Sequence, residues 1–581
     1  MIRYFSSDKI DSIRQRLRKL YDGQHDQRLI ERMDMLVGRY GVGIDPHPVD
    51  EYWSEKDNVL ITYGDIITKD DEAPLVTLRH FLEDHFDGII DTVHILPFFP
   101  FSTDDGFSVI DYRQVRDELG SWYNVEAFTN HFRLMFDLIL NHASRESGWF
   151  KNFVEGIAPY RDYFITVDPD TDLSDVVRPR STPLLSKCYT RMGEKHVWTT
   201  FSEDQIDLNF KNEDVLFEFL DILFYYIYHG VRIIRLDAIA YLWKEIGSKC
   251  IHLENTHEVV KLFRDILSTL APHVLILTET NVPYEENLSY FGDGDEANII
   301  YQFSLPPLLL HALQTGNSSY LTEFSSSLPT PGEGMTYLNF TASHDGIGVR
   351  PLKGLVPKEE FDELIDKIRK RGGKISTKKD KDGSESPYEL NITYLDALRE
   401  SDKDELVVDR FMCSQAVAMS LQGIPAVYFN NLVGSPNNVE GYEETGRART
   451  LNRKKWDRDE LMKKLEDDDS EQGIIFKRYK HLLDIRSSQI AFHPDARQET
   501  LNINEKIFAL KRVSLDDRQT IICLHNVTDE KLTLNRRHVL PGDSDDAHSG
   551  NWKDLISADS FSTDEDQLEL AAYQTMWLTN E

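Results

Sequence analysis

The stretch Val231-Arg-Ile-Ile-Arg-Leu-Asp237 is a short, nearly continuous apolar run that ends on an acidic residue. Such a run is typical of a parallel strand covered on both faces. Further runs of this kind alternate with helical segments, at 59–63, 92–97, 135–141, 274–279, 299–303, 337–340 and 426–430. Eight strands that alternate with helices predict a closed (β/α)₈ TIM barrel of the α/β class.

Two insertions interrupt this alternation. The segment 143–230, after the third strand, is too long for one helix and holds turns rich in Asp and Pro. We expect a small inserted domain over the open end of the barrel. The segment 354–395, after the seventh strand, is expected to be a loop or helical insertion, and its polar, glycine-bearing part at 371–384 predicts a mobile loop.

The chain outside the predicted barrel at 56–490 follows other patterns. Within residues 1–55, Ile10, Ile13 and Leu17 recur at helical spacing, which predicts a helical N-terminal extension packed on the barrel. Within residues 491–581, strand-like runs follow one another without helices, which predicts a C-terminal antiparallel β-domain.

Composition excludes several classes of partner. The 581 residues include 65 basic and 99 acidic side chains, a net charge of −34. Nucleic acid is not expected as a partner, because its binding depends on Lys and Arg contacts to phosphate. The sequence has no apolar run of about 18 residues and no signal-like start, so we expect no membrane span and a cytoplasmic location.

Polar residues close four of the predicted strands. In a TIM barrel, the C-terminal strand ends surround the active site. Retaining glycoside chemistry needs two carboxyl groups about 5 Å apart, one to attack the anomeric carbon and one to protonate the leaving oxygen. The strand ends supply carboxyls and imidazoles for such a site, namely Asn141-His142, Asp237, Glu279 and His344-Asp345.

Arg235 precedes Asp237 by two residues, so both side chains should face the same side of the strand. A cation beside Asp237 would lower the pKa of its carboxyl and help to keep it ionised. The alternative is that Arg235 only fills the barrel interior, where it would need a partner charge.

Four motifs in this order resemble those of glycoside hydrolase family 13, the α-amylase family. They lie at 137–142, 235–238, 278–280 and 343–345. The resemblance implies that Asp237 is the nucleophile, Glu279 the general acid/base and Asp345 a third essential acid. In that family the third acid and two histidines, here His142 and His344, hold hydroxyls of the glucosyl ring, and such contacts strengthen in the transition state.

Further motifs, including 94–99, 105–107, 178–180, 205–207, 302–307 and 344–348, resemble the sucrose phosphorylase subfamily. There the acceptor is phosphate and the product is α-glucose 1-phosphate. The resemblance implies that Arg180, with Arg178 beside it, meets phosphate, and the planar guanidinium suits an anion. A solvated loop charge is the alternative for each arginine. The glucosyl site implied by the resemblance comprises Asp104, Phe107, His142, Gln205, Arg235, His344 and Arg449.

The acceptor loop departs from the sucrose pattern. Sucrose phosphorylases carry Asp-Leu-Tyr-Gln on it, whereas this chain reads Ser386-Pro387-Tyr388-Glu389. This difference, the N-terminal helices and the motifs at 250–254 and 372–376 resemble the glucosylglycerate phosphorylases of the same subfamily. These split 2-O-α-glucosylglycerate with phosphate into glucose 1-phosphate and D-glycerate. Glycerate and phosphate are both anions, and the cations available near the mouth are Arg178, Arg180, Lys244 and Arg449, any of which could meet the glycerate carboxylate. Beside such an anion, Glu389 would need to pair with one of these cations.

The resemblance also implies no cofactor, with inorganic phosphate as a substrate, and a homodimer. Asn141 could serve the Ca²⁺ site of many α-amylases, but no acidic loop here has Ca²⁺ spacing, so no metal is expected. Sucrose, sucrose 6-phosphate and glucosylglycerol stay open as alternative substrates. A hydrolase or transglucosidase and a non-catalytic scaffold are the alternative classes of protein.

Overall fold

A computed structural model describes residues 7–21, 26–43, 49, 51–379, 384–536, 539–540, 552–561 and 567–580. Eight parallel strands close into a barrel in the order β1-β16-β12-β11-β10-β9-β4-β3. They are β1 (Val59–Thr62), β3 (Thr92–Ile95), β4 (Arg133–Ile139), β9 (Val231–Asp237), β10 (Leu275–Thr278), β11 (Ile299–Tyr301), β12 (Thr336–Phe340) and β16 (Ile424–Tyr428). The predicted (β/α)₈ barrel is confirmed, and each predicted apolar run contributes one strand.

The strands form because their side chains are buried on both faces. In β9 every residue except Arg232 is buried, as expected of a strand between a packed barrel interior and a layer of helices. The register between β4 and β9 places Asp137 beside Arg235 and Ile139 beside Asp237. Polar side chains at the strand ends therefore meet at one mouth of the barrel.

Helices surround the barrel. α6 shows why they form: the side chain of Asn212 caps its first turn by accepting a hydrogen bond from the Asp214 amide at 3.0 Å, and its inner face buries Val215 and Phe219. The helices of the barrel and its connections are α3 (Pro74–Phe86), α4 (Trp122–Glu126), α6 (Glu213–Tyr228), α7 (Glu254–Leu270), α8 (Tyr284–Leu288), α9 (Leu305–Thr315), α10 (Ser319–Ser327), α12 (Tyr394–Leu398), α13 (Val407–Ser420), α14 (Phe429–Leu432), α15 (Val439–Thr445), α16 (Arg458–Leu465) and α17 (Glu471–Ser487).

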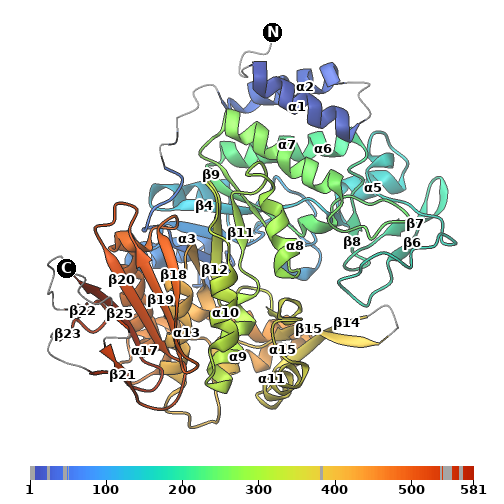
Figure 1. Cartoon of the computed structure of the whole chain (residues 1–581). Coiled ribbons are helices and arrows are strands. Elements are labelled where there is room, and N and C mark those ends of the chain that lie inside the picture. Colours follow the sequence, from blue (N-terminus) through green and yellow to red (C-terminus); the bar gives the residue numbers. More distant parts are fainter. Residues whose placement is uncertain are drawn as a thin grey trace.

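Two N-terminal helices lie on the outside of the barrel. α1 (Ser7–Leu20) packs on α7, and α2 (Asp26–Tyr40) packs on α6 (Figure 1). Charged side chains join the layers, since Arg16 lies 2.5 Å from Asp265 and 3.4 Å from Glu258. The extension therefore adds a further layer outside the barrel helices.

The first insertion, after β4, contains β5 (His142–Ser144), α5 (Gly148–Val154), β6 (Leu185–Thr190), β7 (Gly193–Trp198) and β8 (Gln205–Asp207). β5 and β8 are antiparallel, with His142 opposite Asp207 and Ser144 opposite Gln205. This pairing ties the end of the insertion to the mouth of the barrel.

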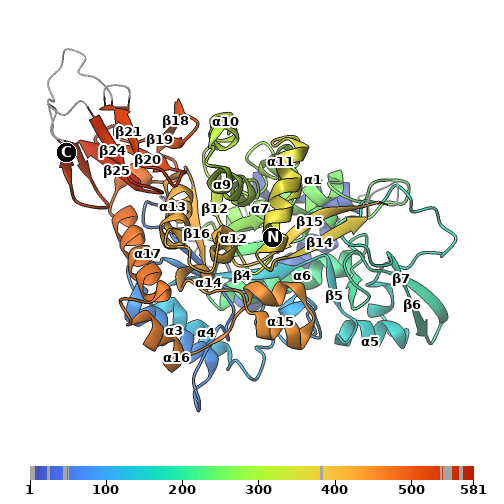
Figure 2. The ribbon, with the colours of Figure 1, turned by 90° about the horizontal axis from the view of Figure 1, so that it is seen from below.

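The second insertion, after β12, contains β13 (Ile347–Gly348), α11 (Lys358–Lys370), β14 (Lys374–Lys379) and β15 (Glu385–Asn391). The prediction of a loop over 371–384 is wrong for 374–379, which form a strand hydrogen-bonded to β15. Residues 380–383 lie outside the described part. β13 pairs with the other edge of β15. Figure 2 shows this hairpin on the same side of the molecule as β6 and β7.

The C-terminal antiparallel sheet is confirmed and lies on the opposite side, next to α13 and α17 (Figures 1 and 2). The side chain of Arg512 is buried there and donates to the carbonyls of Ser420 and His493, each at 2.9 Å. The strands are β18 (Arg497–Asn504), β19 (Ile507–Val513), β20 (Thr520–Asn526), β25 (Thr575–Asn580), β22 (Trp552–Asp554) and β23 (Ser560–Phe561), with a separate pair β21 (Leu532–Asn535) and β24 (Gln567–Leu570). A short pair joins β2 (Ile67–Thr68) to β17 (Trp456–Asp457). Within the described residues, every helix is too short or too polar to cross a membrane.

Candidate active site

The C-terminal ends of the barrel strands surround a pocket. This pocket brings together the residues predicted for the site, with the exception of Arg235, Arg178 and the candidate cation Lys244. The lining residues are Asp104, Phe107, His142, Arg180, Phe201, Gln205, Asp237, Ala238, Glu279, Asn281, His344, Asp345, Tyr388, Glu389 and Arg449.

Arg235 is buried on β9, two residues before Asp237, and does not line the pocket. Its Nη1 donates to Asp237 Oδ1 at 2.8 Å and to Asp137 Oδ1 at 2.5 Å. Asp137 Oδ2 in turn lies 2.7 Å from His94 Nε2. The partner charges that a buried arginine requires are therefore Asp137 and Asp237, and the second of these is the predicted nucleophile.

Ala238 has a left-handed backbone conformation, with φ of 48°. A residue with a Cβ rarely adopts this conformation, which costs about 1–2 kcal/mol. In this conformation the Ala238 amide donates to Glu279 Oε2 at 2.9 Å. The strained turn at the end of β9 thus holds the Glu279 carboxyl beside the chain that carries Asp237.

Both carboxyls have raised pKa values. Burial is the main cause and raises the pKa of Asp237 to about 8; Arg235 opposes the rise, and the charge of Glu279 adds to it. The predicted lowering effect of Arg235 is present, but burial outweighs it. The pKa of Glu279 is also raised, by burial and then by the charge of Asp345, against the opposing effect of Arg235. Because the two carboxyls interact, they titrate as a pair, and the pair keeps a proton to higher pH than an ordinary carboxyl does.

A connected group of side chains covers one wall of the pocket. The rings of Phe107 and His344 stack with centroids 4.8 Å apart and an interplanar angle of 5°. His142 Nε2 lies 2.9 Å from the Phe107 carbonyl oxygen and 3.1 Å from Gln205 Nε2, and Gln205 also donates to Asp104 at 3.3 Å. Burial lowers the pKa of both histidines, so their rings are neutral near pH 7.

Arg449 joins two acids of the pocket. Its Nε and Nη2 donate to the two carboxylate oxygens of Glu389 at 2.9 and 2.8 Å, and its Nη1 lies 2.5 Å from Asp345 Oδ1. Burial raises the pKa of both carboxyls, but the neighbouring basic groups outweigh it and both pKa values are lowered. These groups are Arg449, with His344 and Arg453, at Asp345, and Arg449, with Arg180, at Glu389. Glu389 thus has the cationic partner that the sequence required of it.

Arg180 and Tyr388 lie together at the pocket. The guanidinium carbon of Arg180 is 5.6 Å from the Tyr388 ring centroid, a cation–π distance. No carboxylate of the described residues forms an ion pair with Arg180. Arg178, in contrast, lies outside the lining, and its Nη2 is buried without a hydrogen-bond partner among the described residues.

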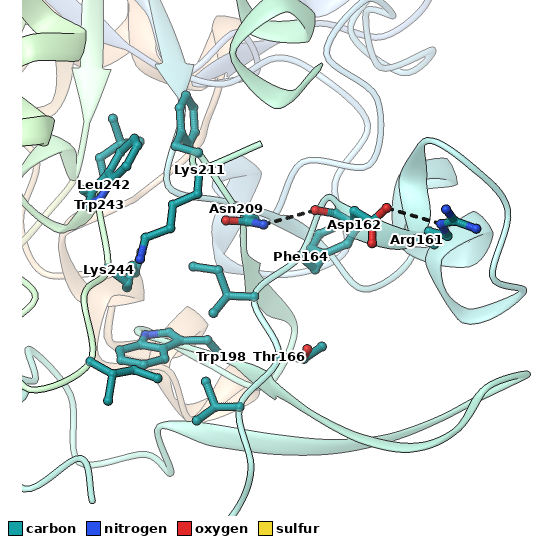
Figure 3. A pocket seen from close by; sticks show the side chains of 14 residues that line it. Arg161, Asp162, Phe164, Thr166, Trp198, Asn209, Lys211, Leu242, Trp243 and Lys244 are labelled. Atoms are coloured by element: carbon teal, nitrogen blue, oxygen red, sulfur yellow. Dashed lines mark hydrogen bonds and ion pairs between the residues drawn. The ribbon is translucent and has the colours of Figure 1, made fainter. Parts of the chain in front are cut away.

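Lys244 does not belong to the acceptor side of the site. Its Nζ lies 2.5 Å from Asp207 Oδ2 and 2.6 Å from Asn141 Oδ1, the amide considered for Ca²⁺. It lines a neighbouring pocket instead, with Lys211 and Trp243 (Figure 3). In the part of the chain that the structure describes, no group of three or more His, Cys, Asp or Glu could hold a metal ion.

Sequence reasoning missed three lining residues. Ala238 follows Asp237 directly, and Asn281 follows Glu279 by two positions, so extending the strand-end argument by a residue or two would have found both. Phe201 reaches the pocket from the first insertion, with its ring centroid 5.3 Å from that of His142. Nothing local in the sequence marks Phe201.

Residues 88–328 match the family described as "Alpha amylase, catalytic domain". A glucosylglycerate phosphorylase of Spirochaeta thermophila is 45% identical over 588 residues, covering 98% of this chain and 99% of that protein. One from Allomeiothermus silvanus is 47% identical over 488 residues, covering 83% and 87% respectively.

Among solved structures, the sucrose 6F-phosphate phosphorylase from Thermoanaerobacter thermosaccharolyticum has a TM-score of 0.68 at 26% identity. The match covers 81% of this chain and 96% of that one. These likenesses agree with the barrel fold and with the acids at its strand ends. The chain belongs to the α-amylase family, and within it to the group of the glucosylglycerate phosphorylases.

Proposed function

We propose that this protein is a retaining glycoside phosphorylase that reversibly transfers the α-glucosyl unit of 2-O-α-glucosylglycerate to phosphate. The full-length likeness to glucosylglycerate phosphorylases supports the substrate. The observation that carries the chemistry is the hydrogen bond from the Ala238 amide to Glu279, because it holds a second carboxyl next to Asp237.

In the first displacement, Asp237 attacks the anomeric carbon while Glu279 gives its proton to the glycosidic oxygen. D-Glycerate leaves with that proton, and the glucosyl unit becomes an ester of Asp237. Burial raises the pKa of both carboxyls, and at Asp237 it outweighs Arg235. Because Arg235 donates a hydrogen bond to Asp237 Oδ1, we assign the proton shared by the coupled pair to Glu279 and the charge to Asp237.

In the second displacement, phosphate takes the place of glycerate. Glu279, now ionised, accepts the proton of the attacking phosphate hydroxyl. The phosphate oxygen attacks the same carbon from the side that glycerate left, and the Asp237 ester bond breaks. Two inversions give α-glucose 1-phosphate with retained configuration. Arg180, which has no carboxylate in ion-pair contact among the described residues, supplies positive charge for the phosphate.

The remaining lining residues hold the glucosyl ring. Asp345 is ionised through Arg449, so its oxygens can accept hydrogen bonds from sugar hydroxyls. The imidazoles of His142 and His344 add polar contacts, and Phe107 offers an apolar ring face. We assign Asp104, Gln205 and Arg449 to the same glucosyl site.

The test is phosphate release from α-glucose 1-phosphate with D-glycerate, glycerol, fructose or fructose 6-phosphate as acceptor. We expect release with D-glycerate well above the rate with water. Release with fructose or glycerol but not D-glycerate would overturn the substrate, and release with water alone would indicate a hydrolase. We further propose that no cofactor takes part, so dialysis against EDTA should leave the rate unchanged.

A further inference from the structure

Arg350 lies beside the acceptor side of the pocket, although neither sequence motifs nor the pocket lining select it. β13 pairs with β15, with Gly348 opposite Glu389, and the Val349 amide donates to the Tyr388 carbonyl at 3.0 Å. Arg350 follows at once, as the first residue of the 3-10 helix η6 (Arg350–Leu352). Main-chain hydrogen bonds therefore fix the position of the Arg350 backbone relative to Tyr388.

Two glycines make this arrangement tight. A Cβ on Gly346 would lie 2.5 Å from Glu389 Cγ, and one on Gly348 would lie 2.6 Å from Asn281 Nδ2. A side chain at either position would therefore force Glu389 or Asn281 to move. The segment before Arg350 is thus held between Glu389 and Asn281, both of which line the pocket.

The guanidinium of Arg350 has little to neutralise it. Nη1 donates to the Asn281 carbonyl at 3.3 Å. Burial raises the pKa of the Tyr241 hydroxyl, and Arg350 opposes this rise through its charge and a side-chain hydrogen bond. Burial also raises the pKa of the Tyr388 hydroxyl, and there Arg350 opposes the rise through its charge. No carboxylate of the described residues is in ion-pair contact with it, in a chain with 99 acidic and 65 basic side chains. A partly buried guanidinium with spare donors, beside a pocket, is suited to an anionic ligand.

Asn281 provides a second, independent sign of a ligand. Its Oδ1 is buried and accepts no hydrogen bond from the described residues. A buried acceptor without a donor costs about 1–3 kcal/mol, so a hydroxyl group placed there would be favoured. The acceptor of the proposed reaction has both matching groups, because glycerate bound through its C2 oxygen carries a carboxylate and a free C3 hydroxyl.

We propose that Arg350 binds the carboxylate of the acceptor and that Asn281 accepts a hydrogen bond from its free hydroxyl. Arg350 is then the residue that selects an acidic acceptor over a neutral polyol. This assignment rests on the proposed function. It leaves Arg180 to the phosphate that occupies the site after glycerate has left.

The variant Arg350→Met tests the assignment, because it keeps an unbranched side chain and removes the charge. Two reactions of α-glucose 1-phosphate are compared: glycerate-dependent phosphate release and arsenate-dependent breakdown to glucose. We expect the KM for D-glycerate to rise about 10- to 100-fold, the loss typical of a charge-assisted hydrogen bond, with arsenolysis changed less than about twofold. Arg350→Lys should recover part of the loss. Lys353→Met, an exposed cation three residues away, is the matched control and should change neither reaction.

Three results would count against the assignment in different ways. An unchanged KM for D-glycerate in Arg350→Met would overturn the role of Arg350. An equal loss of glycerate reaction and arsenolysis would show that Arg350 supports the pocket as a whole and does not select the acceptor. If the unaltered protein released no phosphate with D-glycerate but still catalysed arsenolysis, the proposed substrate would be at fault, and the assignment would fall with it.

Discussion

Glu389, which is buried, and Arg449, which is partly buried, form a bidentate ion pair, with Arg449 Nε and Nη2 at 2.9 and 2.8 Å from the two carboxylate oxygens. The third nitrogen of the same guanidinium contacts Asp345. Glu389 therefore orients an arginine that also contacts Asp345, and so links the proposed acceptor loop to the proposed glucosyl site.

The variant Glu389→Gln should lower kcat/KM for α-glucose 1-phosphate with D-glycerate about 10- to 100-fold. The amide keeps the shape of the side chain but loses the charge, so Arg449 is held less firmly against Asp345. Steady-state kinetics provide the measurement. Glu385→Gln, on the exposed end of β15, is the control and should react like the unaltered protein. Equal rates in both variants would contradict the orienting role.

The pH dependence of the reaction should report the shared proton of Asp237 and Glu279. Burial raises the pKa of both carboxyls, so the pair keeps its proton to higher pH than ordinary carboxyls do. The rate of phosphorolysis is then lost as pH rises through the raised pKa. With α-glucosyl fluoride, whose leaving group needs no protonation, this loss should disappear from kcat/KM. The same loss with both donors would argue against Glu279 as the acid.

Lys244 should be a stability residue. Lys244→Met leaves Asp207 buried without its ammonium partner, which costs about 3–5 kcal/mol in the free energy of unfolding. Urea unfolding measures this loss, and the double variant Lys244→Met with Asp207→Asn should recover part of it. Lys211→Met, exposed in the neighbouring pocket, is the control. A stable Lys244→Met variant would show that the pair contributes nothing net.

The N-terminal helices should contribute stability through charge. Arg16 contacts Glu258, Asp265 and Asp295, so Arg16→Met should lower the free energy of unfolding by about 1–3 kcal/mol. The difference should shrink at about 1 M salt, which screens partly exposed charges. Activity should stay within about twofold. Reduced activity with unchanged stability would instead show that α1 affects the catalytic pocket.

The barrel could be predicted because each strand is a nearly continuous apolar run. Asp237 and Glu279 could be predicted as acids of the pocket because each stands at the end of such a run. The hairpin of β14 and β15 could not be predicted, because 374–379 is polar and its hydrogen bonds depend on a partner strand that starts at Glu385. Lys244 was grouped with the acceptor cations because its buried partner, Asp207, is brought to it only by the fold.

Arg350 could not be selected from the sequence either, because its place at the site also depends on long-range strand pairing. As a sequence position it is an unremarkable loop arginine before a proline. Its proximity to Tyr388 and Asn281 comes from the pairing of β13 with β15, which joins segments about 40 residues apart in the sequence. No local sequence pattern predicts this pairing.

The most direct test of the proposed mechanism is to identify the residue that carries the glucosyl unit between the two displacements. A 5-fluoro-α-glucosyl fluoride donor slows turnover of the ester, and digestion followed by peptide mass spectrometry locates the label. We predict a label on Asp237 that is discharged by D-glycerate or by phosphate faster than by water. A label on any other residue, or a product of inverted configuration, would contradict it.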